Sequence, residues 1–194
     1  KLLCFFFNLF YNISSAGFSG FVFKGVFIMI ALKILDIKDF MSRLLKGEAF
    51  DPFWLVEASI TTYNTFTIDG SLHRDFFDAP LLEALDRTQR TYSLWREVKP
   101  YCFSIIRGKH TPLHFKFVFQ LSRENTSLAV TDSGLLIDPE DVNGMYLNFQ
   151  FHGGELTCTT GTSLRIFTMD KTIDNTWDLM VLSFFKQNGI AFEQ

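Results

Sequence analysis

The sequence predicts an α+β fold, built on a mainly antiparallel sheet with helices packed against it. Apolar residues alternate with other residues over segments such as 115–121 and 145–151, whereas residues 37–45 carry an apolar stripe with helical spacing. Short glycine-containing connections separate several alternating segments, and connections this short join antiparallel strands. The chain has 194 residues, 47% of them hydrophobic and 16% aromatic, which suits one domain with a sizeable core.

The first 28 residues differ in composition from the rest. They contain eight of the 24 Phe residues and, apart from two lysines, no charge. A membrane span is disfavoured because Asn, Ser and Gly interrupt the apolar run. A signal peptide ending near Ala16 is one alternative. The favoured interpretation is that residues 1–28 are a translated stretch of the DNA upstream of the gene, which would begin at Met29. Many of these residues have A/T-rich codons, and the codons for residues 24–26 can contain a ribosome-binding sequence. We therefore expect a single domain at 29–194.

Residues 29–108 are predicted to form strands interrupted by helices. Asp36 can cap a helix whose apolar stripe continues to Gly47. Asp69 and Gly70 are typical of a tight hairpin, so another strand is expected after them. Pro100 is expected to kink or split the last helix. The expected elements are a strand at 30–35, a helix at 37–45, strands at 54–62, 65–68 and 72–76, a linker or surface helix at 78–90, and a helix at 94–106.

Residues 114–194 show the clearest alternation. Every second residue of their first two predicted strands is large and apolar. Ser122 can cap a helix, and glycines at 153–154 and 161 are expected to turn the chain between strands. The expected elements are a strand at 114–121, a helix at 122–130, a single helical turn at 138–140, strands at 145–151, 155–160 and 163–168, and a helix at 173–184.

The two halves of the domain follow the same expected order of strand, helix, three strands and helix. Residues 60–65 and 158–162 also sit at matching corners of this order. We therefore expect two related strand–helix–three-strand halves, with chance similarity of short elements as the alternative.

Three segments, 66–70, 141–144 and 156–167, carry a resemblance to a family of short bacterial proteins known as a domain of unknown function. The resemblance covers 29–194 and implies no known activity. The duplicated unit and residues 154–161 resemble, less closely, one domain of a DNA sliding clamp. That resemblance implies a clamp-like fold but no function by itself. The helices at 94–107 and at the C-terminus have no place in the minimal clamp unit.

Basic residues on the first helix are the candidates for nucleic-acid binding. A net charge of −3 argues against a nucleic-acid-binding protein dominated by basic charge. In a clamp-like domain, however, Lys38, Arg43 and Lys46 would face the DNA backbone and give weak binding. The alternative is that they form a solvated helix face.

Two Thr-rich corners are the candidates for ligand binding. Backbone N–H groups at such turns can bind anions. The alternative is structural, because Thr favours strands and Asn favours turns. The candidate residues are Thr61, Asn64, Thr159, Thr160, Thr162 and Arg165.

No catalytic motif is present. The sequence lacks a phosphate loop, a nucleophile elbow, a zinc-protease motif and a dinucleotide fingerprint. Its four histidines are not spaced as metal ligands, and three cysteines without a C-x-x-C pair predict reduced thiols in the cytoplasm. We expect no catalytic residues, metal or cofactor.

The function expected is a non-catalytic binding or scaffold module, linked to DNA metabolism if it is clamp-like. Its expected partner is another protein or a second copy, and no membrane association is expected. The alternative is a small enzyme or ligand-binding protein that uses the Thr-rich turns.

We expect residues 1–28 to be dispensable. Mass spectrometry of the protein from its native host should give an N-terminus at Met29 or Ile30, as expected of translation from Met29. A mature chain beginning at Gly17 would contradict this and establish the signal peptide.

Overall fold

The computed structural model of the protein describes residues 30–134 and 137–194. Within them the fold is α+β, as predicted, with an eight-stranded antiparallel sheet. The strands are β1 (Ala31–Ile34), β2 (Trp54–Thr61), β3 (Thr65–Asp69), β4 (Ser93–Leu94), β5 (His114–Gln120), β6 (Val142–His152), β7 (Glu155–Leu164) and β8 (Phe192–Glu193). The helices are α2 (Ile37–Lys46), α3 (Ala79–Arg87), α4 (Trp95–Ile106), α5 (Arg123–Asp132) and α6 (Thr172–Gln187), with short 3-10 turns at Arg74–Phe76 and Pro139–Asp141.

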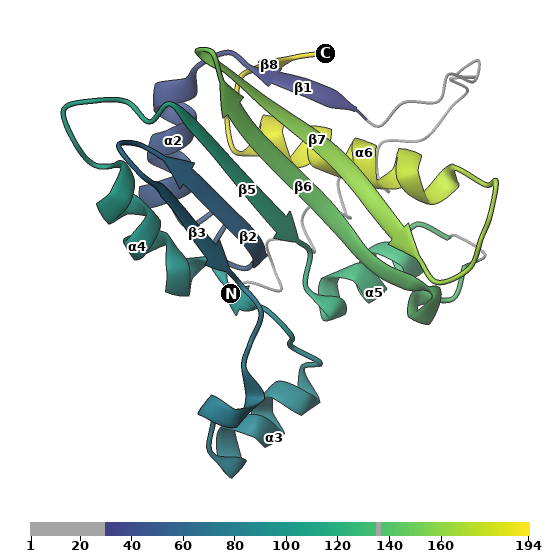
Figure 1. Cartoon of the computed structure of the whole chain (residues 1–194). Coiled ribbons are helices and arrows are strands. Elements are labelled where there is room, and N and C mark those ends of the chain that lie inside the picture. Colours follow the sequence, from purple (N-terminus) through teal and green to yellow (C-terminus); the bar gives the residue numbers. More distant parts are fainter. Residues whose placement is uncertain (1–29, 135–136) are drawn as a thin grey trace.

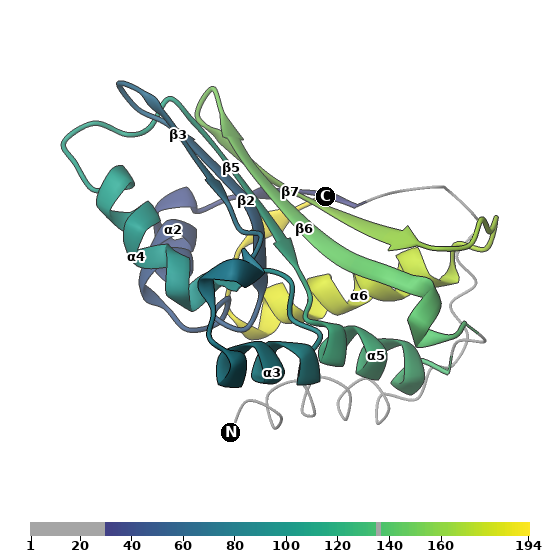
Figure 2. The same ribbon diagram turned by 60° about the horizontal axis from the view of Figure 1, so that its bottom comes forward.

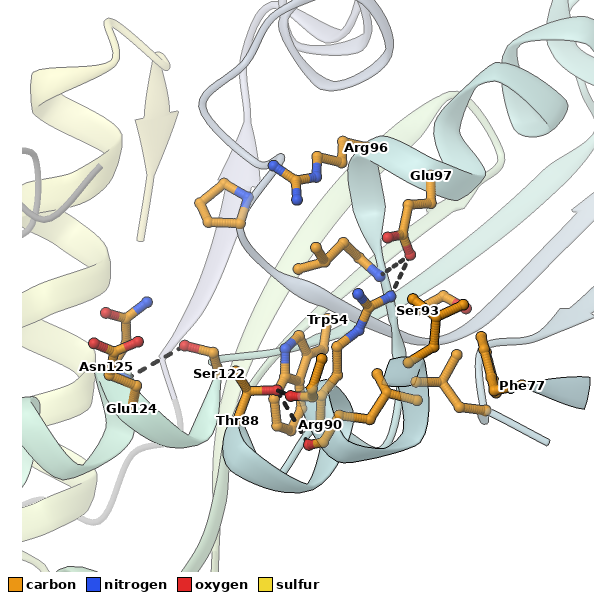
Figure 3. Close-up of a pocket in the computed structure, with 16 residues that line it drawn as sticks. Trp54, Phe77, Thr88, Arg90, Ser93, Arg96, Glu97, Ser122, Glu124 and Asn125 are labelled. Carbon is orange, nitrogen blue, oxygen red and sulfur yellow. Dashed lines mark hydrogen bonds and ion pairs between the residues drawn. The ribbon is translucent and has the colours of Figure 1, made fainter. Parts of the chain in front are cut away.

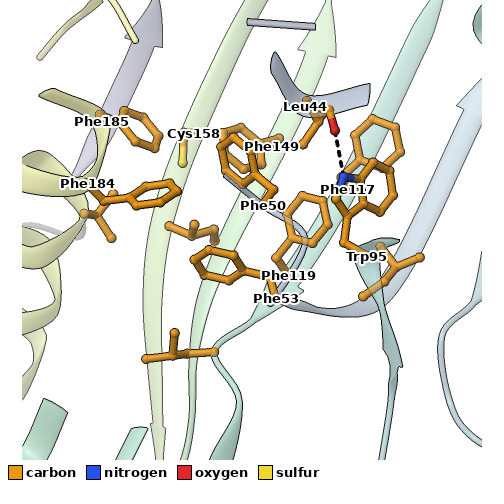
Figure 4. Close-up of a cluster of buried hydrophobic side chains, with 14 of the residues drawn as sticks. Leu44, Phe50, Phe53, Trp95, Phe117, Phe119, Phe149, Cys158, Phe184 and Phe185 are labelled. Atoms are coloured by element: carbon orange, nitrogen blue, oxygen red, sulfur yellow. Dashed lines mark hydrogen bonds between the residues drawn. The ribbon is translucent and has the colours of Figure 1, made fainter. Parts of the chain in front are cut away.

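Four helices, α2, α4, α5 and α6, cover one face of the sheet (Figures 1 and 2). The core between these layers is rich in phenylalanine (Figure 4). The ring of Phe149 on β6 lies 4.9 Å from Phe40 of α2, 5.7 Å from Phe50, 5.9 Å from Phe119 of β5 and 6.2 Å from Phe185 of α6, all between centroids. Aromatic contacts of this kind join both ends of the chain to the central strands.

The opposite face of the sheet is polar. Because side chains alternate along each strand, the residues between the buried phenylalanines point outward. Lys116 pairs there with Glu57 at 2.9 Å, and Lys33 pairs with Glu155 at 2.8 Å. An antiparallel sheet tolerates this one-sided solvation.

The expected hairpin at Asp69 and Gly70 is wrong. β3 ends at Asp69, and residues 74–76 form a 3-10 turn instead of a strand. Gly70 serves close packing: a Cβ there would lie 1.7 Å from the carbonyl oxygen of Leu55. Gly70 lies against the bulge in β2 between Leu55 and Glu57, and its backbone N–H donates to the Val56 carbonyl at 3.0 Å.

Two further expectations are corrected. In place of the two strands expected at 155–160 and 163–168 there is one strand, β7, which runs through Gly161, paired with Tyr146, and ends at Leu164, so residues 165–168 form no strand. Pro100 does not split α4, which runs unbroken from Trp95 to Ile106. Pro100 lies on the exposed side of that helix, where the carbonyl that loses its N–H partner can bond to water.

The expected duplication is also wrong. The strand order is β3-β2-β5-β6-β7-β1-β8, with β4 beside β2. In the second half β5, β6 and β7 are neighbours, whereas in the first half three strands separate β1 from β2. In each half only two strands follow the first helix directly, and the third, β4 or β8, has two residues and comes after a further helix. The halves therefore cannot be superposed.

The remaining elements agree with the sequence. Asp36 and Ser122 cap α2 and α5 as predicted, each accepting a hydrogen bond from the backbone N–H three residues ahead. Residues 78–90 contain the surface helix α3. Among the helices of the described ranges, none has both the length and the apolar character needed to cross a membrane. The expectations for 1–28 lie outside the described residues.

The packing at Gly70 predicts a large loss of stability for Gly70→Ala. The new methyl group would overlap the Leu55 carbonyl, so the strand or the loop must shift, at a cost of about 3 kcal/mol. For a chain of this size the midpoint of thermal unfolding should fall by roughly 10 °C. Gly108→Ala is the control, because a Cβ there meets no atom within 4 Å. Equal melting temperatures for the two variants would contradict this role of Gly70.

Candidate functional site

The structure keeps the two Thr-rich corners apart. Thr61 is the last residue of β2. The row of paired residues across the sheet runs from Thr61 through His114 of β5 and His152 of β6 to Glu155, the first residue of β7. Asn64 lies in the turn after β2, whereas Thr159, Thr160 and Thr162 lie farther along β7 and Arg165 follows its far end. The candidate residues Thr61, Asn64, Thr159, Thr160, Thr162 and Arg165 therefore do not converge on one ligand.

Most of these side chains already have partners within the protein. The Thr160 hydroxyl donates to Asp178 of α6 at 2.5 Å, and Thr162 donates to Asp174 of the same helix. Arg165 donates to the side-chain oxygen of Asn143 at 3.2 Å. These bonds fasten β7 and the segment after it to neighbouring elements, which supports the structural interpretation of the second corner.

Asp178 is the carboxylate that this arrangement buries. Burial raises the pKa of the Asp178 carboxyl above its ordinary value, the hydrogen bond from Thr160 opposes this rise, and the nearby Asp174 adds to it. A buried acid next to a hydroxyl resembles a catalytic feature. Here, however, it links a strand to a helix, and it does not line the cavity between α3 and the starts of α4 and α5.

The three basic residues of α2 do not form a uniform free surface. Lys38 is exposed, but Arg43 donates to Asp39 at 2.5 Å and to the backbone oxygen of Asn188 at 2.8 Å. Lys46 lies 5.6 Å from the ring centroid of Phe103. Arg43 thus joins α2 to the end of α6, and nucleic-acid binding by this helix stays a prediction.

Burial suppresses the reactivity of both cysteines in the described ranges. It raises the pKa of Cys102 to about 12 and that of Cys158 even further. A nucleophile needs the thiolate, so these side chains act as small core residues. Within residues 30–134 and 137–194, no three His, Cys, Asp or Glu side chains are grouped closely enough to hold a metal.

A cavity that the sequence did not predict lies between α3 and the starts of α4 and α5 (Figure 3). Its volume is about 680 Å³. Trp54 of β2 and Leu94 line it on the side of the sheet, and Phe77, Leu81 and Leu85 line it on the side of α3. The walls are therefore largely apolar.

Polar groups surround this cavity. Arg90 forms an ion pair with Glu97, whose carboxylate also accepts the Leu94 backbone N–H at 3.0 Å. Arg96 lies at one edge, and Asn125 of α5 at another (Figure 3). The mixture of charges gives the rim no dominant sign.

The sequence did contain a weak signal for the cavity. Phe77, Leu81 and Leu85 recur every four residues, which places them on one face of a helix. Residues 78–90 are otherwise the least regular part of the chain. Periodicity could predict a surface helix there, but not what its apolar stripe would face.

Comparison with known protein families gives one family model, described as a family of unknown function (DUF5721), which matches residues 43–193. This confirms the resemblance to a family of unknown function. The resemblance to a sliding clamp is not confirmed. Neither the curated proteins nor the solved structures contain a match to the chain.

The burial of Asp178 predicts that Asp178→Asn stabilises the protein at alkaline pH. The folded-state pKa lies above that of the unfolded chain, so stability falls as pH rises through the folded-state pKa. An amide can still accept the Thr160 bond, without the cost of burying charge. The melting temperature of the variant should exceed that of the wild type at pH 8, and the gap should close toward pH 4. Asp75→Asn, at an exposed site, is the control. A gap that does not change with pH would contradict this assignment.

Proposed function

The chain belongs to the family of unknown function DUF5721, and we propose that it is a non-catalytic binding module whose ligand occupies the cavity beside α3. The observation that carries the proposal is the cavity itself. Its volume of about 680 Å³ falls within the range of small-molecule sites, which are mostly apolar with a few polar groups at defined positions. The apolar walls and polar rim match that description.

The state of α3 supports the proposal. The helix has nine residues and none of them is buried. Helices this short are marginal in water and depend on tertiary packing. Its Leu81 is 53% exposed, although it lines the cavity. A ligand that covered this side chain would contribute about 1 kcal/mol from that leucine alone, and would hold α3 against the body of the domain.

The lining indicates the class of ligand. Arg90 and Glu97 neutralise each other, and the remaining rim contains both Arg96 and Glu124. The rim of the cavity therefore discriminates only weakly between anionic, cationic and neutral ligands. The ligand is an apolar molecule of small-organic size, with one polar end that remains near the rim. The indole of Trp54, which is almost completely buried, forms part of the apolar wall.

Other parts of the earlier expectation receive unequal support. The Thr-rich turns are far apart and largely engaged within the protein, so they do not support the enzyme alternative. The strand order contradicts the expected duplication, and the expected link to DNA metabolism depended on that duplication. A protein partner or a second copy remains compatible with a binding module. The buried thiols of Cys102 and Cys158 are compatible with a bacterial cytoplasmic location, which we retain in the proposal.

The proposal predicts saturable binding of a neutral apolar fluorescent probe, N-phenyl-1-naphthylamine, to the folded chain. Leu81→Lys should weaken this binding at least tenfold, because it places a charge in the apolar wall. Leu179→Lys on α6 is the matched control, since the two leucines are 53% and 51% exposed and both lie on helices. Near-UV circular dichroism should show that both variants keep native packing.

Intrinsic fluorescence gives a second measurement of the same event. The indoles of Trp95 and Trp177 are buried and donate to backbone carbonyls, whereas Trp54 lines the cavity. The probe should therefore change tryptophan emission in the wild type and change it much less in Trp54→Phe. Equal affinity in Leu81→Lys and Leu179→Lys would overturn the proposal, as would the absence of saturable binding.

A further inference from the structure

Two histidines on the open face of the sheet lie against each other. His114 begins β5 and His152 ends β6, and the register places them directly opposite. Their Nδ1 atoms are 2.8 Å apart, and their rings are nearly parallel, with centroids 4.5 Å apart. Both side chains are exposed. This solvent-facing nitrogen pair does not line the cavity, and it lies beside Thr61 of the first Thr-rich corner.

The chemistry of imidazole limits what such a pair can do. A neutral ring has one N–H donor and one nitrogen lone pair, so two Nδ1 atoms in contact share a single proton between them. A metal ion that accepts both lone pairs can take the place of that proton. Neutral imidazole is also among the commonest metal ligands in proteins.

The separation of the two nitrogens favours one class of ion. With metal–nitrogen bonds of about 2.0 Å, two ligands at 90° are about 2.8 Å apart, whereas two ligands of a tetrahedral ion are about 3.3 Å apart. The observed 2.8 Å matches the right-angled arrangement. Square-planar and tetragonal sites with nitrogen and oxygen ligands are typical of Cu²⁺ and Ni²⁺.

We propose that His114 and His152 form a two-imidazole binding site for a divalent transition metal of the Cu²⁺ and Ni²⁺ class. Among the described residues no third His, Cys, Asp or Glu completes the site, so water or an external ligand takes the remaining positions. The site is therefore open, as in metal centres that exchange ligands.

The surroundings hold the pair in place without competing for the metal. The residues next in sequence, Phe115 and Phe151, stack inside the core with centroids 5.0 Å apart, which fixes both strands beneath the histidines. Glu155, opposite His152, pairs with Lys33 at 2.8 Å. Lys116, two residues from His114 on the same face, pairs with Glu57 at 2.9 Å. The neighbouring charges are thus already neutralised.

Calorimetric titration of the full chain with NiCl₂ and with CuCl₂ tests the site. Binding should need both imidazoles, so His114→Ala and His152→Ala should each weaken it at least tenfold. His73→Ala and His110→Ala, at two other exposed histidines, should leave it unchanged. Copper should bind more tightly than nickel, MgCl₂ should not bind, and affinity should fall in acid because the ligands must be deprotonated.

Melting temperature provides a readout that does not depend on heat of binding. Saturating Ni²⁺ should raise the melting temperature of the wild type, since the ion joins β5 to β6 in the folded state only. The rise in melting temperature should disappear in His114→Ala and in His152→Ala, and it should persist in His73→Ala. The proposal would be overturned if neither Ni²⁺ nor Cu²⁺ bound saturably, or if His114→Ala and His152→Ala both kept the wild-type affinity.

Discussion

The aromatic layer between the sheet and its four helices is the contact on which the rest of the structure depends. Phe149 joins β6 to α2, α6 and β5, and Trp95 donates its indole N–H to the Leu44 carbonyl at 2.8 Å, which links α4 to α2. Because side chains alternate along a strand, burying one set of residues commits the next set to the opposite face. The burial of Phe115 and Phe151 therefore exposes His114 and His152 together.

The cavity has a different origin, in the chain between β3 and β4. Gly70 lets the chain leave the sheet by passing very close to β2, and the chain returns where the Ser93 N–H donates to the Gly70 carbonyl at 2.8 Å. The residues between these points form α3, which has no place in the main core. The chain on each side of α3 is attached to the sheet, but no residue of the helix itself is buried. An apolar space therefore remains between α3 and the rest of the domain. That space is bounded by Trp54, which the sheet fixes.

Local patterns predicted the elements better than their arrangement. Alternation identified β5 and β6, and the capping residues Asp36 and Ser122 identified two helix starts, because these signals act within a few residues. Glycine misled the prediction at Gly70 and Gly161, since the same residue suits a turn, a close contact or a strand position. The Thr-rich corners could be found in sequence, but the bonds from Thr160 and Thr162 of the second corner to α6 could not. The cavity and the histidine pair depend on contacts between distant segments and were missed.

The strand order shows why the two halves cannot be separate units. β1, from the beginning of the described chain, lies between β7 and β8 from its end, and it buries Leu32 and Ile34 in the common core. β2 likewise pairs with β5 across the midpoint of the sequence. The family match begins at residue 43, after β1 and within α2. A chain cut at that point would lose an interior strand and leave the edge of β7 without a partner. The fold therefore requires residues that precede the matched region.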